Sequence, residues 1–367
     1  RLDRLPQVAV EGWFGQILVD YDATPGIGDV AIRVKLGAIY IVPLAQYAPL
    51  ALLNVAPNYQ GRSLCRTLLA RFVNRAIDAG LDRLYLRTWP GNVKAVPLYK
   101  KCGFVWEPDS SVLMPNYLPA IFRLPPARAF FDGRDWYRCL ERELRQEEDD
   151  ERWEGMKAYA YRFADNGHAL SVWIDRESGA PLALETGAYF AGLIAANPDP
   201  PRGLETAIRC RLRNKTAMPM RVALRAAGEG GIALEHRETL TLAAGEEREI
   251  EAVGRIAPRA EGKPKAVAEL DIEGERFELA AGLRPCPPVE IRLEPEALSL
   301  APGIEREARV WWRNQTGSPI EVSLALAAPE GLRAEWSLPP LALAAGERGE
   351  ARVALLAERE GIFDVSC

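Results

Sequence analysis

Apolar residues recur every three or four positions after residue 63, which is the spacing of one helix face. The pattern predicts an amphipathic helix that ends at Gly80. The short apolar run 49–55 predicts a buried strand before it, and a turn that contains Gly61 joins the strand to the helix. The apolar face of this helix is formed by Leu64, Leu68, Leu69, Phe72, Val73, Ala76 and Ile77.

A second strand and helix follow the first pair. Residues 84–89 predict a strand, and the helix after it is about ten residues long and ends at Gly103. A strand is then expected to start at Phe104, and residues 114–124 predict the strand that closes the sheet. Further strand-like runs lie upstream, at residues 16–21 and 38–42. Strands and helices that alternate in this order predict an α/β fold.

The pattern changes after residue 130. Residues 133–152 predict a charged helix with Trp136, Leu140 and Leu144 on one face. The acidic run 147–151 fits the solvated end of that helix, and a site for a partner is the alternative. Residues 156–185 alternate between apolar and polar side chains and predict a β-meander, with a hairpin turn at 165–167.

From about residue 204 the chain consists of short alternating strands and turns, and it repeats itself. The sequence RNKT at 213–216 returns as RNQT at 313–316, and LAAGE at 242–246 returns at 343–347. Two such copies predict tandem β-sandwiches that resemble immunoglobulin-type modules. A sandwich does not identify a function, so a protein- or glycan-binding appendage and a spacer or dimerisation module both stay open. The second copy stops before its last strand, so the natural protein is expected to continue.

Composition narrows the class of protein. A chain of 367 residues with 48% hydrophobic residues is expected to form two or three domains. A net charge of −5 argues against a nucleic-acid binder, and the absence of long apolar runs argues against a membrane protein. The six cysteines lack the spacing of a metal site or a disulfide framework, which is typical of a reducing compartment. We therefore expect a cytoplasmic protein without a bound metal.

The candidate chemistry lies at the start of the first helix and along the second helix. A glycine-containing turn that leads into a helix presents backbone N–H groups at the positive end of the helix dipole, which is an anion site. In the second segment, Asn92, Ala95, Leu98, Tyr99, Gly103 and Phe104 form the pattern N-x-x-A-x-x-L-Y-x-x-x-G-F. With the loop that starts at Gln60, this stretch resembles the acyl-CoA-binding half of the GNAT superfamily of N-acetyltransferases. The chain departs from that family at Ser63 and Cys65, where glycine or alanine is usual.

The resemblance implies an α/β fold with a mixed sheet and flanking helices, and it implies a site. The loop amides would hold the pyrophosphate of coenzyme A, Tyr99 would protonate the departing thiolate, and Asn92 would orient the pantetheine or acetyl end. Val55 would bond the pantetheine through its backbone. The implied cofactor-binding residues are Val55, Gln60, Gly61, Arg62, Ser63, Leu64, Cys65, Arg66 and Asn92. Restoring glycine at positions 63 and 65 is expected to tighten coenzyme A and to cost roughly 1 kcal/mol of helix stability per glycine.

The implied function is acetyl transfer from acetyl-CoA to a primary amine of a small molecule or protein, by direct attack. The alternative is a non-catalytic binding or scaffold protein built on a degenerate GNAT domain, because Ser63 and Cys65 crowd the loop. The alternative for Tyr99 is a core aromatic with a satisfied hydroxyl. The base stays unassigned; the side chains that flank the expected cleft are Asp20, Asp22, Asn54 and Glu107.

The predicted organisation has four parts. Residues 1–130 form the GNAT-like domain, 131–202 a connecting helix and meander, 203–286 the first sandwich, and 287–367 a second, incomplete sandwich. The sandwiches are candidate sites for a protein partner or for homodimer formation. Because no cofactor motif lies beyond Phe104, a fragment that ends near residue 200 is expected to fold and bind acetyl-CoA.

Overall fold

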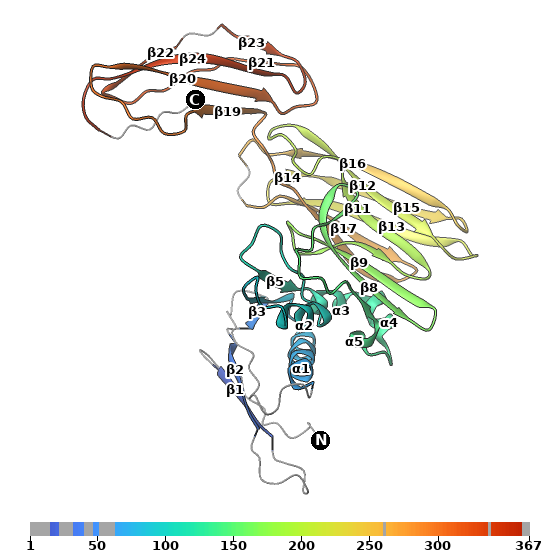
Figure 1. Cartoon of the computed structure of the whole chain (residues 1–367). Coiled ribbons are helices and arrows are strands. Elements are labelled where there is room, and N and C mark those ends of the chain that lie inside the picture. Colours follow the sequence, from blue (N-terminus) through green and yellow to red (C-terminus); the bar gives the residue numbers. More distant parts are fainter. Residues whose placement is uncertain are drawn as a thin grey trace.

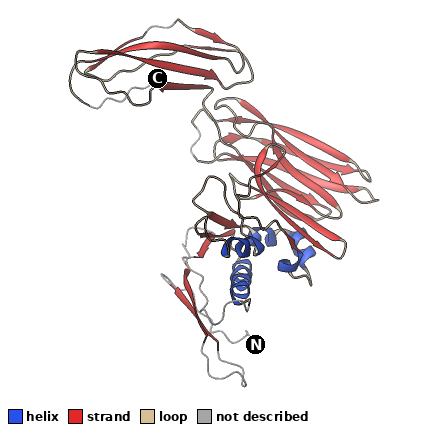
Figure 2. Ribbon diagram, viewed as in Figure 1, coloured by secondary structure: helices blue, strands red, loops and turns tan. Residues whose placement is uncertain are grey.

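The computed structural model describes residues 63–259, 262–336 and 339–361, together with the backbone of three strands nearer the N-terminus (Figure 1). The helices gather in the first part of the chain, and the rest is built from strands (Figure 2). The predicted order of an α/β part followed by an all-β part is confirmed. The early strands are β1 (Gly15–Tyr21), β2 (Ile32–Ile39) and β3 (Tyr47–Leu50).

These strands belong to a five-stranded sheet in the order β1-β2-β3-β4-β5. Strands β3 and β4 (Arg83–Arg87) are parallel, and helix α1 (Leu64–Asp78) lies between them in the chain. The helix buries Leu69, Val73 and Ala76, so the predicted apolar face is confirmed at these positions. Strand β5 (Leu113–Asn116) closes the sheet against β4 in antiparallel pairing.

Helix α2 (Ala95–Lys101) ends as the sequence predicts. Gly103 has a φ of +87°, the amide of Phe104 donates to the carbonyl of Tyr99 at 3.1 Å, and the amide of Gly103 donates to that of Lys100 at 3.0 Å. These two bonds form the glycine-terminated helix end known as the Schellman motif. A side chain at Gly103 would also lie 2.6 Å from Leu118, so both the conformation and the space require glycine.

Three predicted elements are wrong. Phe104 makes an isolated bridge to Asn116 and does not start a strand. The segment 114–124 is a strand only up to Asn116, because Pro119 lies in the first turn of helix α3 (Leu118–Arg123), which α4 (Pro125–Phe131) follows.

The charged helix predicted for 133–152 is also absent. Only α5 (Trp136–Cys139) is helical there, and β6 (Leu140–Glu141) follows it directly. Leu140 pairs with Phe163 in the next sheet, so the chain is drawn into strand structure. The acidic run 147–151 forms ion pairs with other elements instead of ending a helix in solvent.

The predicted meander is confirmed as part of a larger sheet. Its hairpin turns at Asn166 and Gly167, which both have positive φ, as a two-residue hairpin turn requires. The meander strands pair onward with those of the first repeat in a nine-stranded sheet. Its members are β6, β7 (Glu151–Trp153), β8 (Met156–Asp165), β9 (His168–Asp175), β10 (Pro181–Glu185), β11 (Tyr189–Ala195), β12 (Glu205–Asn214), β14 (Ile232–Ala233) and β16 (Glu247–Ile256).

A four-stranded sheet, in the order β15-β13-β17-β18, packs on this sheet. One hydrophobic core runs from Leu69 on α1 through both sheets to Leu283. Residues on both sides of the boundary expected between 202 and 203 contribute to this one core, and the boundary itself stays a prediction. The strands of the second sheet are β13 (Met220–Glu229), β15 (Glu235–Leu242), β17 (Lys265–Ile272) and β18 (Glu275–Gly282).

The two repeats share one buried asparagine bond pattern. Asn214 donates to the carbonyls of Met218, Leu242 and Ala243 and accepts from Thr216, and Asn314 makes the equivalent bonds one repeat later. Both side chains are fully buried, so the repeated sequence marks a polar anchor between turns. Resemblance to immunoglobulin-type modules stays a prediction.

The second repeat has a core of its own, built around Val310, Trp312 and Val353. It stands apart from the rest of the molecule in Figure 1. A four-stranded sheet, β19-β20-β24-β22, and a two-stranded sheet, β21-β23, make it up. Its strands are β19 (Val289–Glu294), β20 (Glu305–Asn314), β21 (Ile320–Val322), β22 (Leu332–Glu335), β23 (Leu341–Leu343) and β24 (Arg348–Ala357).

Candidate acyl-CoA site

The N-terminus of α1 is the first half of the candidate site. As the first residues of a helix, Leu64, Cys65 and Arg66 have amides without an intrahelical carbonyl acceptor. Ser63 occupies the N-cap position, but its side chain makes no capping hydrogen bond. Ser63 and Arg66 are exposed and Cys65 is half-buried, so this helix end is open to an anion.

Ser63 adopts a conformation that suits glycine. Its φ and ψ are 62° and 11°, in the left-handed region, where an L-residue with a Cβ is strained. Cys65, by contrast, lies inside the helix. The equal cost expected for glycine at both positions is therefore wrong for Ser63, because this residue stands outside the helix at a place where glycine relieves strain.

We expect Ser63→Gly to raise the free energy of unfolding by about 0.5–1 kcal/mol, and Cys65→Gly to lower it by about the same amount. Urea denaturation of the two variants measures both changes. The Ser63→Ala variant is the matched control, because it removes the hydroxyl and keeps the Cβ. Equal stabilisation by Ser63→Ala would contradict the conformational explanation.

Tyr99 lies on the last turn of α2, half-buried against Phe104, with ring centroids 6.2 Å apart in an edge-on contact. Burial raises the pKa of Tyr99, and the negative form of the Cys65 thiol would raise it further. Because Cys65 lies in the first turn of α1, this electrostatic influence indicates that the phenol lies near the start of that helix. Within the described part of the chain, the Tyr99 hydroxyl has no hydrogen-bond partner. Tyr99 is thus a protonated donor at neutral pH.

Asn92 builds the turn before α2. Its side-chain amide donates to the hydroxyl of Thr88 at 2.9 Å. Its backbone carbonyl accepts from the amides of Ala95 and Val96, both at 3.1 Å. These bonds give Asn92 a structural role in starting the helix. Its part in orienting pantetheine stays a proposal.

Two basic side chains lie at the start of α1 and at the end of α2. The Arg66 guanidinium lies 5.8 Å and the Lys101 ammonium 5.5 Å from the centroid of the Tyr137 ring, so one aromatic residue holds a cation from each helix. With the open amides of α1, these two cations suit the phosphates of coenzyme A. The donor set therefore fits the ligand that the sequence implies.

Several predicted residues lie outside the described residues. For the cofactor site these are Val55, Gln60, Gly61 and Arg62, and for the base they are Asn54, Asp22 and the side chain of Asp20. Glu107 is described, and its amide donates to the carbonyl of Leu113 at 2.9 Å at the edge of β5. Of the predicted site, the structure therefore places Ser63, Leu64, Cys65, Arg66, Asn92 and Tyr99.

Burial raises the pKa of the Cys102 thiol to about 12, so this residue beside Tyr99 is a packed thiol and no nucleophile. The described cysteines 65, 102, 139, 210 and 286 are free. Among described residues, no cluster of three or more His, Cys, Asp or Glu side chains is arranged to hold a metal. The described helices include none that is long and apolar enough to span a membrane.

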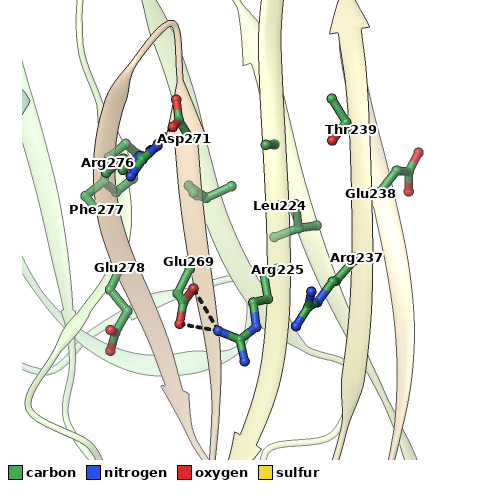
Figure 3. A pocket seen from close by; sticks show the side chains of 12 residues that line it. Leu224, Arg225, Arg237, Glu238, Thr239, Glu269, Asp271, Arg276, Phe277 and Glu278 are labelled. Atoms are coloured by element: carbon green, nitrogen blue, oxygen red, sulfur yellow. Dashed lines mark hydrogen bonds and ion pairs between the residues drawn. The ribbon is translucent and has the colours of Figure 1, made fainter.

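A hollow of about 620 Å³ lies on the exposed face of the four-stranded sheet, away from the candidate site (Figure 3). Arg237, Arg225, Glu269 and Glu278 follow one another across its four strands. Arg225 and Glu269 pair with each other at 3.3 Å. Such pairing is ordinary for a solvated sheet face and provides no nucleophile or proton donor at a reacting centre.

Comparison with known proteins finds a family match in the first part of the chain. Residues 34–104 match the model of the Acetyltransferase (GNAT) family. The chain contains a GNAT acetyltransferase domain. The matched residues include the start of α1 and end at Phe104, so they contain all six described residues of the candidate site.

A curated relative is named as an acetyltransferase. The spermidine N(1)-acetyltransferase of Vibrio cholerae serotype O1 is 43% identical over 58 residues, which make up 14% of this chain and 31% of that protein. The chain therefore spans less than a third of the length of this relative. The GNAT domain and this relative support acetyl transfer in general.

Solved structures with weak similarity cover about half of the chain. The transglutaminase of red sea bream is 13% identical with a TM-score of 0.28, over 48% of this chain and 28% of that one. The Salmonella alpha-2-macroglobulin reacted with methylamine is 14% identical with a TM-score of 0.24, over 54% and 17%. Scores of this size say nothing about the β-rich part, which is described from its own strands.

Sequence reasoning missed Asp149 and Tyr161, which lie beyond the GNAT match and bind α2 and the residues just after it. Lys100, next to Tyr99, is 1% exposed and binds Asp149, and Tyr161 binds the carbonyl of Gly103. One signal was available, because Lys100 follows the buried Val96 by one helical turn and so falls on an inward face. A lysine in such a place requires a charged partner.

Proposed function

We propose that this chain transfers the acetyl group of acetyl-CoA to a primary amine. The observation that carries the proposal is the GNAT match over residues 34–104, within which a half-buried Tyr99 lies near the open start of α1. GNAT acetyltransferases use acetyl-CoA, and the residues at this helix start fit its phosphates. Polyamines are the first acceptors to test, because the curated relative is named for spermidine.

A few groups carry out the proposed reaction. The amides of residues 64–66 and the Arg66 guanidinium bind the phosphates and fix the position of the thioester. The amine nitrogen attacks the acetyl carbon, the C–S bond breaks, and Tyr99 gives its phenolic proton to the leaving sulfur. The amine loses its own proton to a base that stays unassigned, and solvent returns a proton to Tyr99.

The raised pKa of Tyr99 supports this assignment. A general acid must be protonated before the step, and burial keeps the phenol protonated beyond the usual range of tyrosine. The Cys65 thiol, whose pKa burial also raises, leaves the site without a competing anion at neutral pH.

A non-catalytic binding or scaffold protein is the second candidate. It is favoured by Ser63 and Cys65, whose side chains stand where the family has glycine or alanine. One assay distinguishes the two functions. It measures the amine-dependent release of free thiol from acetyl-CoA, with spermidine as the first amine. Release that requires both the amine and Tyr99 supports the transferase. Saturable binding of acetyl-CoA without release by any primary amine supports the binding protein.

A further inference from the structure

The segment that follows the GNAT domain grips the helix of Tyr99. This clamp consists of residues 140–149 and Tyr161, all of which lie beyond the matched residues 34–104. It touches the chain on both sides of Tyr99, from Pro90 before α2 to Trp106 after it.

The centre of the clamp is Asp149. Its carboxylate lies 3.1 Å from the ammonium of Lys100 and 3.1 Å from the guanidinium of Arg142, and it accepts the amide of Trp106 at 2.5 Å. Its own amide donates to the carbonyl of Trp106 at 2.9 Å. Asp149 therefore joins α2, the residues after it and the clamp segment at one point.

Lys100 depends on this contact because its side chain is buried. Its side chain is 2% exposed, and its ammonium also donates to the carbonyl of Glu147 at 2.7 Å. A buried ammonium requires its charged and polar partners, so α2 cannot rotate about its axis without losing them. Since Tyr99 is the neighbour of Lys100 in the chain, this contact also sets the direction of the phenol.

The clamp holds the end of α2 as well. The hydroxyl of Tyr161 donates to the carbonyl of Gly103 at 2.9 Å and accepts the amide of Tyr117 at 3.0 Å, and it is fully buried. The ammonium of Lys101 donates to the carbonyl of Leu140 at 3.3 Å. Groups of the clamp thus bind α2 and the residues just after it at three places: Lys100, Lys101 and Gly103.

We infer that Asp149 and Tyr161 are positioning residues that set the orientation of Tyr99 for acetyl transfer. The inference rests on the proposed function, because it assigns these residues to the reaction through Tyr99. Because Tyr161 lies on β8, the inference also gives the β-meander a role in the reaction.

The test compares Asp149→Asn and Tyr161→Phe with Asp165→Asn in the full chain. Asp165 is the matched control, because it pairs with Arg134 at 3.2 Å, and this pair is not part of the clamp. Amide hydrogen exchange of α1 and α2, the Kd for acetyl-CoA, and kcat are measured for each. We expect α2 amides to exchange about tenfold faster in both clamp variants while α1 amides keep their rates.

Turnover gives the second readout. We expect kcat to fall about tenfold in the clamp variants with the Kd for acetyl-CoA within about twofold of the wild type, because α2 moves while α1, whose first amides and Arg66 bind the phosphates, does not. The double variant Lys100→Met with Asp149→Asn removes the unpaired buried ammonium and should slow α2 exchange again.

Two outcomes would overturn the inference. Exchange that accelerates equally in α1 and α2 would show a general structural role, and α2 exchange at the wild-type rate would show that the clamp does not hold the helix. A wild-type chain without turnover on any amine would instead refute the proposed function. The exchange data would still decide whether Asp149 and Tyr161 hold α2, so the two failures are distinguishable.

Discussion

Replacement of Tyr99 with phenylalanine is expected to lower kcat for acetyl transfer by about 10²–10⁴ and to leave the affinity for acetyl-CoA nearly unchanged. The substitution removes one hydroxyl, which has no partner in the described part of the chain, and keeps the ring contact with Phe104. Steady-state release of thiol gives kcat, and isothermal titration gives the affinity.

The control is Tyr159→Phe, which removes a hydroxyl from a buried ring on β8 that belongs to neither the candidate site nor the clamp. Its kcat should stay within about twofold of the wild type. The pH profile adds a check. Because the pKa of Tyr99 is raised, the wild-type rate should fall only above the ordinary tyrosine value near 10. Full turnover in Tyr99→Phe would remove this residue from the mechanism.

A fragment that ends near residue 200 is expected to lose cooperative folding, and one that ends at residue 286 to keep it. Cutting at residue 200 removes β12, which pairs with β11 at seven positions, and the whole four-stranded sheet that covers the core. It also leaves the buried carboxylate of Asp175 without the amide of Gly282, which donates to it at 2.8 Å. Thermal unfolding followed by circular dichroism measures the difference.

The same two fragments locate the acetyl-CoA site. The fragment 1–286 contains the whole of the first core, so it should bind acetyl-CoA like the full chain. This prediction replaces the expectation that residues 1–200 suffice. A cooperative transition in the fragment 1–200 would show that the GNAT domain does not depend on the shared core.

Local patterns predicted the local elements well. The spacing of Leu69, Val73 and Ala76 predicted the buried face of α1, and Gly103 predicted the end of α2. The pair Asn166 and Gly167 predicted the hairpin between β8 and β9. In each case the signal and the structure that it specifies lie within a few residues, so periodicity and turn chemistry are enough.

Long-range contacts explain what the sequence did not show. The acidic residues near Asp149 look like a solvated helix end, because the buried cation of Lys100 that pairs with Asp149 lies far away in the chain. The continuation of the meander into β12 depends on pairing between strands, which composition does not record. At Ser63 the residue type gives no sign of a positive φ, so the gain expected from glycine became visible only in the structure.

Calorimetric titration of the full chain with acetyl-CoA tests the central claim most directly. If the start of α1 still holds the coenzyme, one molecule should bind per chain, and Arg66→Glu should weaken the affinity at least about tenfold by placing a negative charge beside the phosphates. Circular dichroism confirms that both proteins are folded. A folded wild-type chain that gives no saturable heat with acetyl-CoA would contradict the account.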